Sequence, residues 1–294
     1  MALIELIERL KQERGLFQLI KSAWYPLIDA KWAIERALVR SCPVCNGSGP
    51  FQRLRGYGRT FLKCPACTHI WAHDYSRMRA LIGMGINDFG GGEPDGGGDT
   101  EMFLARFCAE QLGAKSILLF GTGPTQAFRV LIGEGYDVSG SDVSADVIKF
   151  RQDEFGADRF FHPADIGNRK FDVIISTEVI EHFFKPQAEI KGVVGHLNPG
   201  GIFCGSTGFS KDGGLDEGPN RYMEPRGHVI FWSEASLKAA FEQLGLTLTS
   251  FALGSDFASA RIFFGTQDAA ISAKLGGLKQ KQGETPLFTM PAAL

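Results

Sequence analysis

Short apolar runs alternate with amphipathic segments between about residue 100 and residue 266. Such alternation is typical of a parallel α/β sheet, in which helices connect successive strands. The run at 171–176 is almost entirely apolar, as expected for a strand that is covered on both faces. The pattern predicts strands at 116–120, 136–140, 159–161, 171–176 and 201–206, and an antiparallel pair at 246–251 and 261–264. Helices are predicted at 125–134, 145–152 and 187–197, and from a cap at Ser233 to residue 244.

The remaining chain divides into four shorter parts. Residues 1–40 have helical apolar spacing interrupted at Pro26, which predicts two amphipathic helices. These helices either pack on the protein itself or contact a membrane surface or a partner protein. Residues 41–80 hold a cysteine unit, and the glycine-dense stretch 81–99 predicts a flexible linker. The tail at 267–294 has low apolar density and is expected to be frayed.

Composition narrows the class of protein. Hydrophobic residues make up 44% of the 294 residues, which is enough for a sizeable core and excludes global disorder. A net charge of −2 gives no overall sign of a nucleic-acid partner. The chain shows no secretory signal pattern, and no run reaches the roughly 18–20 apolar residues of a membrane span. We therefore expect a cytoplasmic protein.

Four of the six cysteines are spaced as metal ligands. Cys42, Cys45, Cys64 and Cys67 follow the pattern C-x2-C-x18-C-x2-C. Two such pairs can close a tetrahedral thiolate site, which is typical of a structural zinc ribbon. His69 and His73 are spare ligands nearby. A redox role would need a thioredoxin-like context that the surrounding sequence lacks.

Zinc ribbons can also contact nucleic acid. Arg53, Arg55, Arg59 and Lys63 supply positive charge, and Phe51, Tyr57 and Phe61 could stack on bases. Four charges are ordinary for a unit of this size, so nucleic acid is a weaker hypothesis than a small-molecule or glycan-like substrate.

A nucleotide-type site is predicted at the carboxyl ends of the first strands. Gly121-Thr122-Gly123 follows the first strand and opens a helix, whose N-terminus can face polar ligand atoms. Asp142 follows the second strand, where an acid can accept hydrogen bonds from ribose hydroxyls, and Asp165 follows the third. Gln126 stands where a dinucleotide fingerprint needs a small residue, which argues against NAD.

These segments together resemble class I S-adenosylmethionine (SAM)-dependent methyltransferases over about residues 100–266. The matching segments are 117–123, 138–144, 164–165, 171–182, 197–201 and 228–233, in the order of the family. The resemblance implies a Rossmann-like sheet of parallel strands with one antiparallel hairpin strand, preceded here by N-terminal helices and a small zinc ribbon. It implies SAM as cofactor, held by Phe120, Gly121, Thr122, Gly123, Asp142, Val143, Asp165, Ile166 and Thr177.

Two positions depart from the family pattern. Leu119 replaces the usual acid and Thr125 replaces a third glycine. If these changes abolish SAM binding, the domain is a non-catalytic scaffold that binds a partner.

Candidates for a general base lie in the later motifs. His228 is the first choice because histidine titrates near neutral pH, and His182, Glu178 and Tyr222 are the others. His228 follows a Gly/Pro-rich segment at 208–227 that could be a substrate lid. Glu181 could equally cap the start of a helix. Asp172, Cys108 and Cys204 are expected to be structural.

The sequence thus supports a methyltransferase that acts on a small-molecule or glycan-like acceptor. The alternatives are an RNA or protein methyltransferase guided by the zinc ribbon, and the non-catalytic scaffold.

Overall fold

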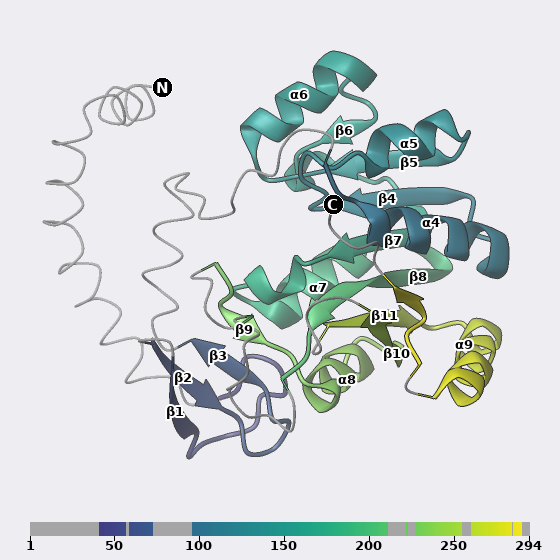
Figure 1. Cartoon of the computed structure of the whole chain (residues 1–294). Helices are drawn as coiled ribbons and strands as arrows, with labels where there is room; N and C mark the ends of the chain where they lie inside the picture. Colours follow the sequence, from purple (N-terminus) through teal and green to yellow (C-terminus); the bar gives the residue numbers. More distant parts are fainter. Residues whose placement is uncertain are drawn as a thin grey trace, which may run out of the picture.

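Two β-sheets form the framework of the protein (Figure 1). The computed structural model describes residues 41–56, 59–72, 96–210, 222, 227–254, 260–283 and 285–289. The larger sheet has eight strands in the order β12-β10-β11-β8-β7-β4-β5-β6. Its strands are β4 (Ser116–Phe120), β5 (Asp137–Ser141), β6 (Phe160–Phe161), β7 (Phe171–Thr177), β8 (Leu197–Gly208), β10 (Thr247–Gly254), β11 (Ala260–Thr266) and β12 (Phe288–Thr289).

Strands β4 to β8 run parallel to one another, and β11 is antiparallel to both β8 and β10. This confirms the predicted Rossmann-like sheet with an antiparallel hairpin. Side chains of β7 point alternately to the two faces of the sheet, and both faces are covered. Val173 and Ile175 face one apolar cluster and Ile174 faces another.

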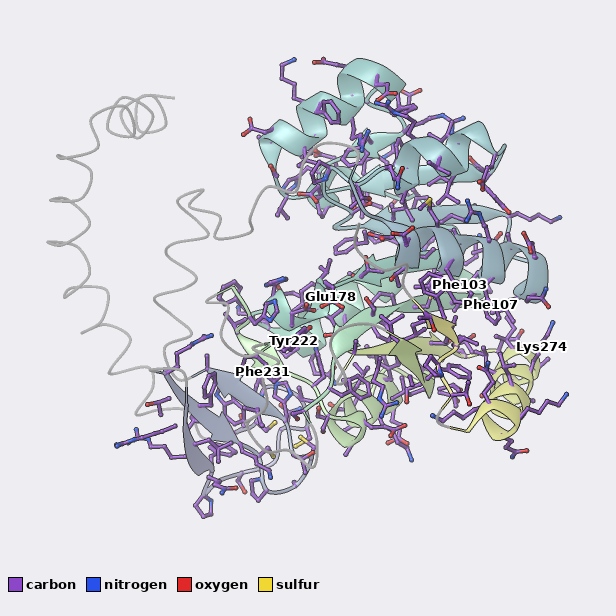
Figure 2. The ribbon with its side chains drawn as sticks, viewed as in Figure 1. Phe103, Phe107, Glu178, Tyr222, Phe231 and Lys274 are labelled. Carbon is purple, nitrogen blue, oxygen red and sulfur yellow. The ribbon has the colours of Figure 1, made fainter. Side chains whose placement is uncertain are left out.

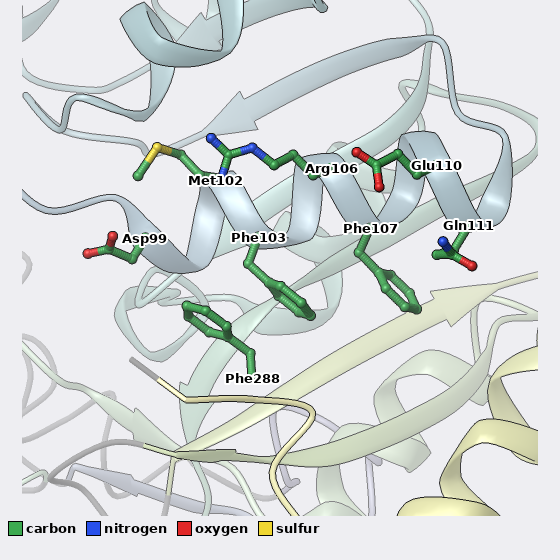
Figure 3. A pocket seen from close by; sticks show the side chains of 8 residues that line it. All are labelled: Asp99, Met102, Phe103, Arg106, Phe107, Glu110, Gln111 and Phe288. Carbon is green, nitrogen blue, oxygen red and sulfur yellow. The ribbon is translucent and has the colours of Figure 1, made fainter. Parts of the chain in front are cut away.

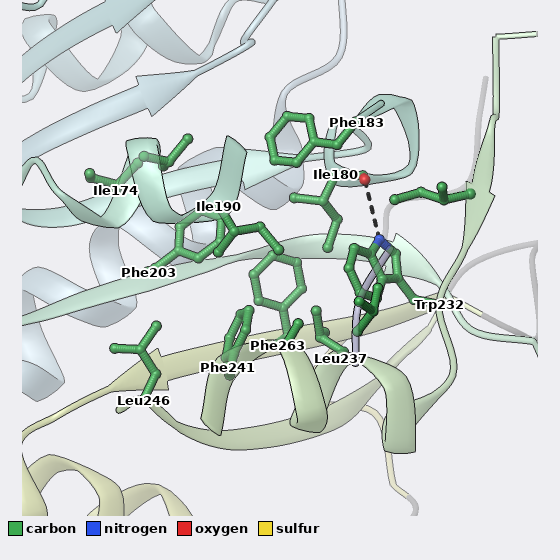
Figure 4. Close-up of a cluster of buried hydrophobic side chains, with 14 of the residues drawn as sticks. Ile174, Ile180, Phe183, Ile190, Phe203, Trp232, Leu237, Phe241, Leu246 and Phe263 are labelled. Atoms are coloured by element: carbon green, nitrogen blue, oxygen red, sulfur yellow. Dashed lines mark hydrogen bonds between the residues drawn. The ribbon is translucent and has the colours of Figure 1, made fainter. Parts of the chain in front are cut away.

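Helices cover both faces of this sheet. They are α4 (Asp99–Leu112), α5 (Ala127–Gly133), α6 (Ala145–Phe155), α7 (Pro186–Val194), α8 (Glu234–Glu242) and α9 (Ala269–Gln282). Buried side chains of α7 and α8, including Ile190, Leu237 and Phe241, join Phe203 and Phe263 of the strands in one cluster (Figure 4). Leu104, Phe128 and Leu275, from α4, α5 and α9, belong to the cluster on the opposite face. The core therefore lies in two layers with the sheet between them.

The smaller sheet joins the cysteine unit to the large domain. Its strands, β1 (Gln52–Gly56), β2 (Arg59–Lys63), β3 (Ile70–Ala72) and β9 (Ile230–Phe231), are antiparallel to their neighbours. The sequence predicts the first two of these strands at 51–54 and 60–63. Strand β9 comes from the far end of the chain and pairs Phe231 with Ile70. Such short strands carry too few residues for a periodic signal.

The expectation of a frayed tail is wrong for most of its length. Asp268 caps α9 by accepting hydrogen bonds from Ala270 N and Ile271 N, and the buried Leu275 anchors the helix. Strand β12 pairs in parallel with β10, and Phe288 stacks on Phe103 of α4 with ring centroids 4.6 Å apart (Figure 3). A few well-placed apolar residues are enough to dock a segment whose average apolar content is low.

Several expectations fall outside the part of the chain that the structure describes. These are the two helices at 1–40, most of the linker at 81–99 and most of the segment at 208–227. Within the described part, no helix is long and apolar enough to cross a membrane.

Candidate functional site

The predicted glycine loop lies at the end of β4, with its backbone in the conformation that glycine favours. Gly121 and Gly123 have φ of +72° and +62°. The amide of Gly121 donates to Ser141 O at 2.8 Å, which fastens the loop to β5. A Cβ on Gly121 would lie 2.6 Å from Cγ2 of Val179, whereas one on Gly123 would meet nothing within 4 Å. The loop therefore packs closely on its β7 side and has open space at Gly123.

Asp142 follows β5 and faces this loop. Its two carboxylate oxygens accept hydrogen bonds from Gly123 N at 2.9 Å and from Ser144 N at 2.8 Å. The residue is 8% exposed, so its position is fixed by its surroundings. A carboxylate offers about four lone-pair sites, so it can still accept from two ribose hydroxyls. Next to it Val143 is 67% exposed, where it can contact a flat apolar group.

The other predicted cofactor residues lie at the same edge of the sheet. Phe120 is paired with Ser141 in the β4–β5 register, and Thr177 ends β7, the other neighbour of β4. Asp165 ends a short 3₁₀ turn after β6 and is exposed, whereas Ile166 is buried. An open space at Gly123 and a fixed acid opposite it are features that suit the ribose and amino acid parts of SAM.

The two departures from the family pattern have structural consequences. Leu119 is fully buried in the core cluster with α4 and α5. Thr125 lies in the loop, where its hydroxyl is 3.3 Å from that of Thr122. The buried guanidinium of Arg151 donates to the carbonyls of Pro124 and Thr125. The loop is thus held by hydrogen bonds from α6 in addition to its glycines.

A polar cluster lies directly beyond β7 and β8, with Glu181 at its centre (Figure 2 labels Glu178 and Tyr222). Glu181 is inaccessible to solvent. Its carboxylate accepts hydrogen bonds from the hydroxyls of Tyr222 at 2.7 Å and Thr207 at 3.1 Å. From the sequence, Glu181 could cap the start of a helix. In the structure it lies instead among the four candidates for the general base, which are His228, His182, Glu178 and Tyr222.

Two histidines complete the cluster. His228 Nε2 lies 3.9 Å from Glu181 Oε1, and the rings of His182 and His228 are in edge-to-face contact with centroids 4.9 Å apart. Each histidine turns Nδ1 toward a backbone carbonyl, His182 toward Gly227 O at 2.8 Å and His228 toward Tyr222 O at 2.6 Å. A carbonyl only accepts hydrogen bonds, so Nδ1 of His228 carries the proton and its neutral ring presents an unprotonated Nε2. The ring of His182 has a second hydrogen bond, to the backbone of Glu178.

Glu178 also belongs to this cluster, through a hydrogen bond with Glu181. It follows β7 with a φ of +53°, which is rare for a residue with a side chain. Its carboxyl group accepts a hydrogen bond from the Ser206 hydroxyl at 2.9 Å. Strained backbone of this kind is concentrated at functional sites.

Burial governs the protonation of the cluster. The protein around its carboxyl group and then the nearby Glu181 charge raise the pKa of Glu178 to about 8, although the residue as a whole is exposed. Burial and then His182 lower the pKa of His228 to about 4. Burial likewise lowers the pKa of His182 and raises that of Glu181. Both histidines are therefore neutral near pH 7, which a proton acceptor requires.

Glu101 is a further site residue that the sequence does not indicate. It belongs to the first turn of α4, is 7% exposed, and has its pKa raised by burial. Thr177 hydrogen-bonds to its carboxyl group, and Glu178 is close enough to contribute electrostatically. Helix α4 itself was not predicted, so nothing in the sequence placed this acid beside β7.

The four cysteines converge in the other unit. The Sγ atoms of Cys42 and Cys67 are 3.6 Å apart, as are those of Cys45 and Cys64, and all four lie within 4.8 Å of one another. Four sulfurs at 2.3 Å from one zinc ion would be about 3.8 Å apart. The donor set and its spacing therefore fit a tetrahedral zinc ion. Val44 N and Gly47 N each lie 3.4 Å from a cysteine sulfur, as in a zinc knuckle.

The spare histidines do not join this group. His69 is fully buried between Trp71 and Trp232, with ring centroids 5.9 Å and 5.1 Å away, and burial lowers its pKa to about 3. The cysteine group does not include it, and His73 lies outside the described residues.

The cysteine unit touches the polar cluster. Arg59 of β2 donates to the carbonyl of His228 at 3.1 Å. The hydroxyl of Thr68 lies 2.6 Å from that of Ser233, the cap of α8. Cys42 and Cys67 share an apolar cluster with Trp232, whose indole N–H donates to Ile180 O at 3.2 Å (Figure 4). The cysteine unit therefore forms one side of the region around His228.

The remaining expectations and a surface pocket lie apart from these groups. Asp172 accepts hydrogen bonds from Lys115 N, Ser116 N and Asn198, and Cys108 and Cys204 are fully buried, so all three are structural as predicted. A pocket along α4 contains no predicted site residue. It is lined by Asp99, Met102, Phe103, Arg106, Phe107, Glu110, Gln111 and Phe288 (Figure 3).

Comparison with solved structures finds methyltransferases. No curated protein matches the chain. One similar structure is the methyltransferase domain of bacterial CtHen1-C, at 18% identity over 58% of this chain and 98% of that one, with a TM-score of 0.45. Another is magnesium protoporphyrin IX methyltransferase from Synechocystis PCC 6803 with bound SAH, at 16% identity over 57% and 82%, with a TM-score of 0.42. A third is the plantazolicin methyltransferase BpumL with SAH, at 12% identity over 57% and 83%, with a TM-score of 0.43.

A family model described as "Methyltransferase domain" matches residues 99–250. That span begins with α4 and includes the glycine loop, Asp142, the Glu178–His182 segment and His228. Since the match covers more than half of the 294 residues and coincides with the sheet and its polar edge, the chain belongs to the methyltransferase-domain family.

Proposed function

We propose that this protein transfers the methyl group of SAM to a small-molecule or glycan-like acceptor at the polar cluster of Glu178, Glu181, His182, Tyr222 and His228. The observation that carries the proposal is the position of this cluster. It follows β7 and β8 at the sheet edge where the glycine loop and Asp142 also lie, and Gly121 packs on Val179, the neighbour of Glu178. Ligands in open α/β sheets bind at this edge.

The cofactor would be held by the residues around the glycine loop. Asp142 would accept from the ribose hydroxyls, and the space at Gly123 would admit the amino acid end. Asp165 and Ile166 would border the adenine, with Val143 exposed beside it. When bound, SAM supplies a methyl group already activated by its sulfonium, so the protein has to position the acceptor rather than activate the methyl group. Such positioning can contribute up to about 7–11 kcal/mol.

The cluster would bind the acceptor and remove its proton. His228 is the first candidate for the proton acceptor, because its ring is neutral and Nδ1 is held by Tyr222 O. Its side chain is 14% exposed, which leaves a route for the acceptor. Tyr222, which is buried, and His182, whose ring contacts that of His228, would orient the acceptor, and Glu178, which is exposed, would border it.

The cysteine unit would hold a structural Zn²⁺ ion through Cys42, Cys45, Cys64 and Cys67. Its four thiolates would fill the coordination shell, so the ion would stabilise the unit and take no part in transfer. Through Arg59 and β9, the same unit would support the acceptor side of the site.

Calorimetric titration with SAM and with S-adenosylhomocysteine tests the cofactor assignment. We expect micromolar binding of both ligands to the zinc-loaded protein. Asp142→Ala should weaken binding at least tenfold, because it removes the ribose acceptor and releases Gly123 N. The matched control is Asp158→Ala, an exposed acid in a turn near β6. Absence of binding by the folded wild-type chain would favour the non-catalytic scaffold, with Leu119 and Thr125 marking the lost site.

A further inference from the structure

Glu181, His182 and His228 form a group whose chemistry exceeds that of a proton acceptor. One donor atom from each side chain lies within 4.8 Å of the other two. Two imidazoles and one carboxylate are the donor set of many mononuclear transition-metal sites, which leave coordination positions open. The group is formed by two segments of the chain, the turn after β7 and the residues before β9.

The distances suit a shared cation better than direct hydrogen bonds. His228 Nε2 and Glu181 Oε1 are 3.9 Å apart, which is too long for a hydrogen bond. Two ligands at 2.0–2.2 Å from one ion can be separated by up to about 4.4 Å when they lie opposite each other. The three donor atoms lie within 4.8 Å of one another, so their side chains need to move inward only slightly to bind one ion.

The second layer of contacts orients all three side chains. Tyr222 O accepts from Nδ1 of His228, which fixes the tautomer that presents its Nε2, and the ring of His182 is held by the backbone of Gly227 and Glu178. Metal-binding histidines almost always have such a partner on the other nitrogen. The hydroxyls of Thr207 and Tyr222 hold the Glu181 carboxylate, which also has hydrogen bonds with the Glu178 side chain and with its own backbone. The site is thus assembled on rigid backbone, and the 14% exposure of His228 gives an ion access from solvent.

We propose that Glu181, His182 and His228 bind one divalent transition-metal cation, whose open positions take a hydroxyl oxygen of the acceptor. The role of the ion rests on the proposed function, whereas its binding does not. The acceptor class is then an alcohol or phenol, and the reaction is O-methylation.

The metal changes the part that His228 plays. Its Nε2 is then a ligand, and the cation lowers the pKa of the bound hydroxyl group. The hydroxyl proton is released to solvent, which reaches the site beside the 14% exposed side chain of His228. The oxygen electron pair forms the O–CH₃ bond as the S–CH₃ bond of SAM breaks, which leaves neutral S-adenosylhomocysteine.

Binding of Mn²⁺ to the zinc-loaded, full-length protein tests the site. The electron paramagnetic resonance signal of free Mn²⁺ reports binding without any acceptor. We expect one Mn²⁺ per chain, and at least tenfold weaker binding for Glu181→Gln and for His228→Gln. His196→Gln is the matched control, because Nδ1 of His196 also faces a backbone carbonyl, Arg169 O at 3.2 Å, outside this group.

Two further readouts separate misfolding and failure of the proposed function from failure of the site. Zinc content and SAM affinity should stay within twofold of wild type in both variants, since the cysteines and Asp142 are untouched. A folded wild-type protein that takes up no Mn²⁺, or variants that bind it as tightly, would overturn the metal site and leave SAM binding intact. Mn²⁺ binding without SAM binding would support the metal site and refute the methyl transfer.

Discussion

A single buried carboxylate, Glu181, organises the acceptor side of this protein. An ionised group in the interior is costly unless hydrogen bonds or a counter-charge compensate it. The hydroxyls of Thr207 and Tyr222 provide two such bonds, one from β8 and one from the segment before β9. The sequence named Glu178, His182, Tyr222 and His228 as candidates, because their residue types suit acid–base work. It could not rank Glu181, because burial is a property of the fold.

Thr207→Val tests the contribution of one of these bonds. The variant keeps the shape of the side chain but leaves Glu181 with one donor fewer. A hydrogen bond to a charged group contributes about 1.5–3 kcal/mol, so we expect the free energy of unfolding in urea to fall by about that amount in metal-free buffer. Thr249→Val, on the half-buried part of β10, should change it by less than about 0.5 kcal/mol. Equal effects of the two variants would contradict the role given to Thr207.

Among the structural elements, the loop between β4 and α5 shows most clearly how position determines the role of a residue. Gly121 and Gly123 have similar backbone conformations but different surroundings, one against Val179 and the other facing open space. The sequence identifies both as glycines of a cofactor loop. Only their neighbours distinguish a glycine needed for packing from one needed for a ligand.

Alanine substitutions should separate these two roles. Both variants place a side chain at positive φ, which costs about 1–2 kcal/mol. Gly121→Ala adds a contact of 2.6 Å with Val179, so overpacking should cost a further 1–3 kcal/mol, roughly. We expect Gly121→Ala to have the lower urea midpoint. Gly123→Ala should match the stability of Gly135→Ala, a control with φ of +88° and open surroundings, yet bind SAM at least tenfold more weakly. Undiminished SAM affinity in Gly123→Ala would refute the placement of the cofactor.

The N-terminal cap of α8 is a second feature that stabilises a single element. Ser233 and Ser236 exchange side-chain and backbone hydrogen bonds in a capping box. Ser233→Ala should lower the free energy of unfolding by about 1–2 kcal/mol, measured by urea denaturation. Ser272→Ala, inside α9, is the control and should leave stability within about 0.5 kcal/mol. A neutral Ser233→Ala would mean that the cap does not hold the helix.

At the scale of the whole molecule, the cysteine unit and the large domain share both a sheet and an apolar cluster. Strand β9 pairs with β3, Arg59 donates to His228 O, and Cys42 packs in the same cluster as Trp232. The unit is therefore part of the acceptor side rather than an independent appendage.

Loss of the zinc ion should consequently disturb residues of the large domain. Cys64→Ser should reduce the zinc content well below one ion per chain and weaken the near-ultraviolet circular dichroism of Trp71 and Trp232. SAM affinity should fall less than threefold, because β4 and β5 hold the glycine loop. Cys108→Ala is the control, since Cys108 is a core residue that does not belong to the four-cysteine group. A zinc-free Cys64→Ser protein with an unchanged spectrum would disprove the coupling.

The sequence by itself determined the features that local pattern encodes. Apolar periodicity predicted the strands β4 to β8 and the β10–β11 pair, glycine and acid spacing predicted the loop and Asp142, and cysteine spacing predicted a tetrahedral thiolate group. Each of these depends on residues that are close in the chain or on a fixed spacing between them.

Only the tertiary structure decided what depends on contacts between distant segments. It paired β3 with β9, docked α9 and β12, and brought Glu101 beside Thr177. It also placed His182 and His228 in ring contact around the buried Glu181. Short strands and single polar residues carry little local signal, and their energies depend on burial and on partners that exist only once the chain has folded.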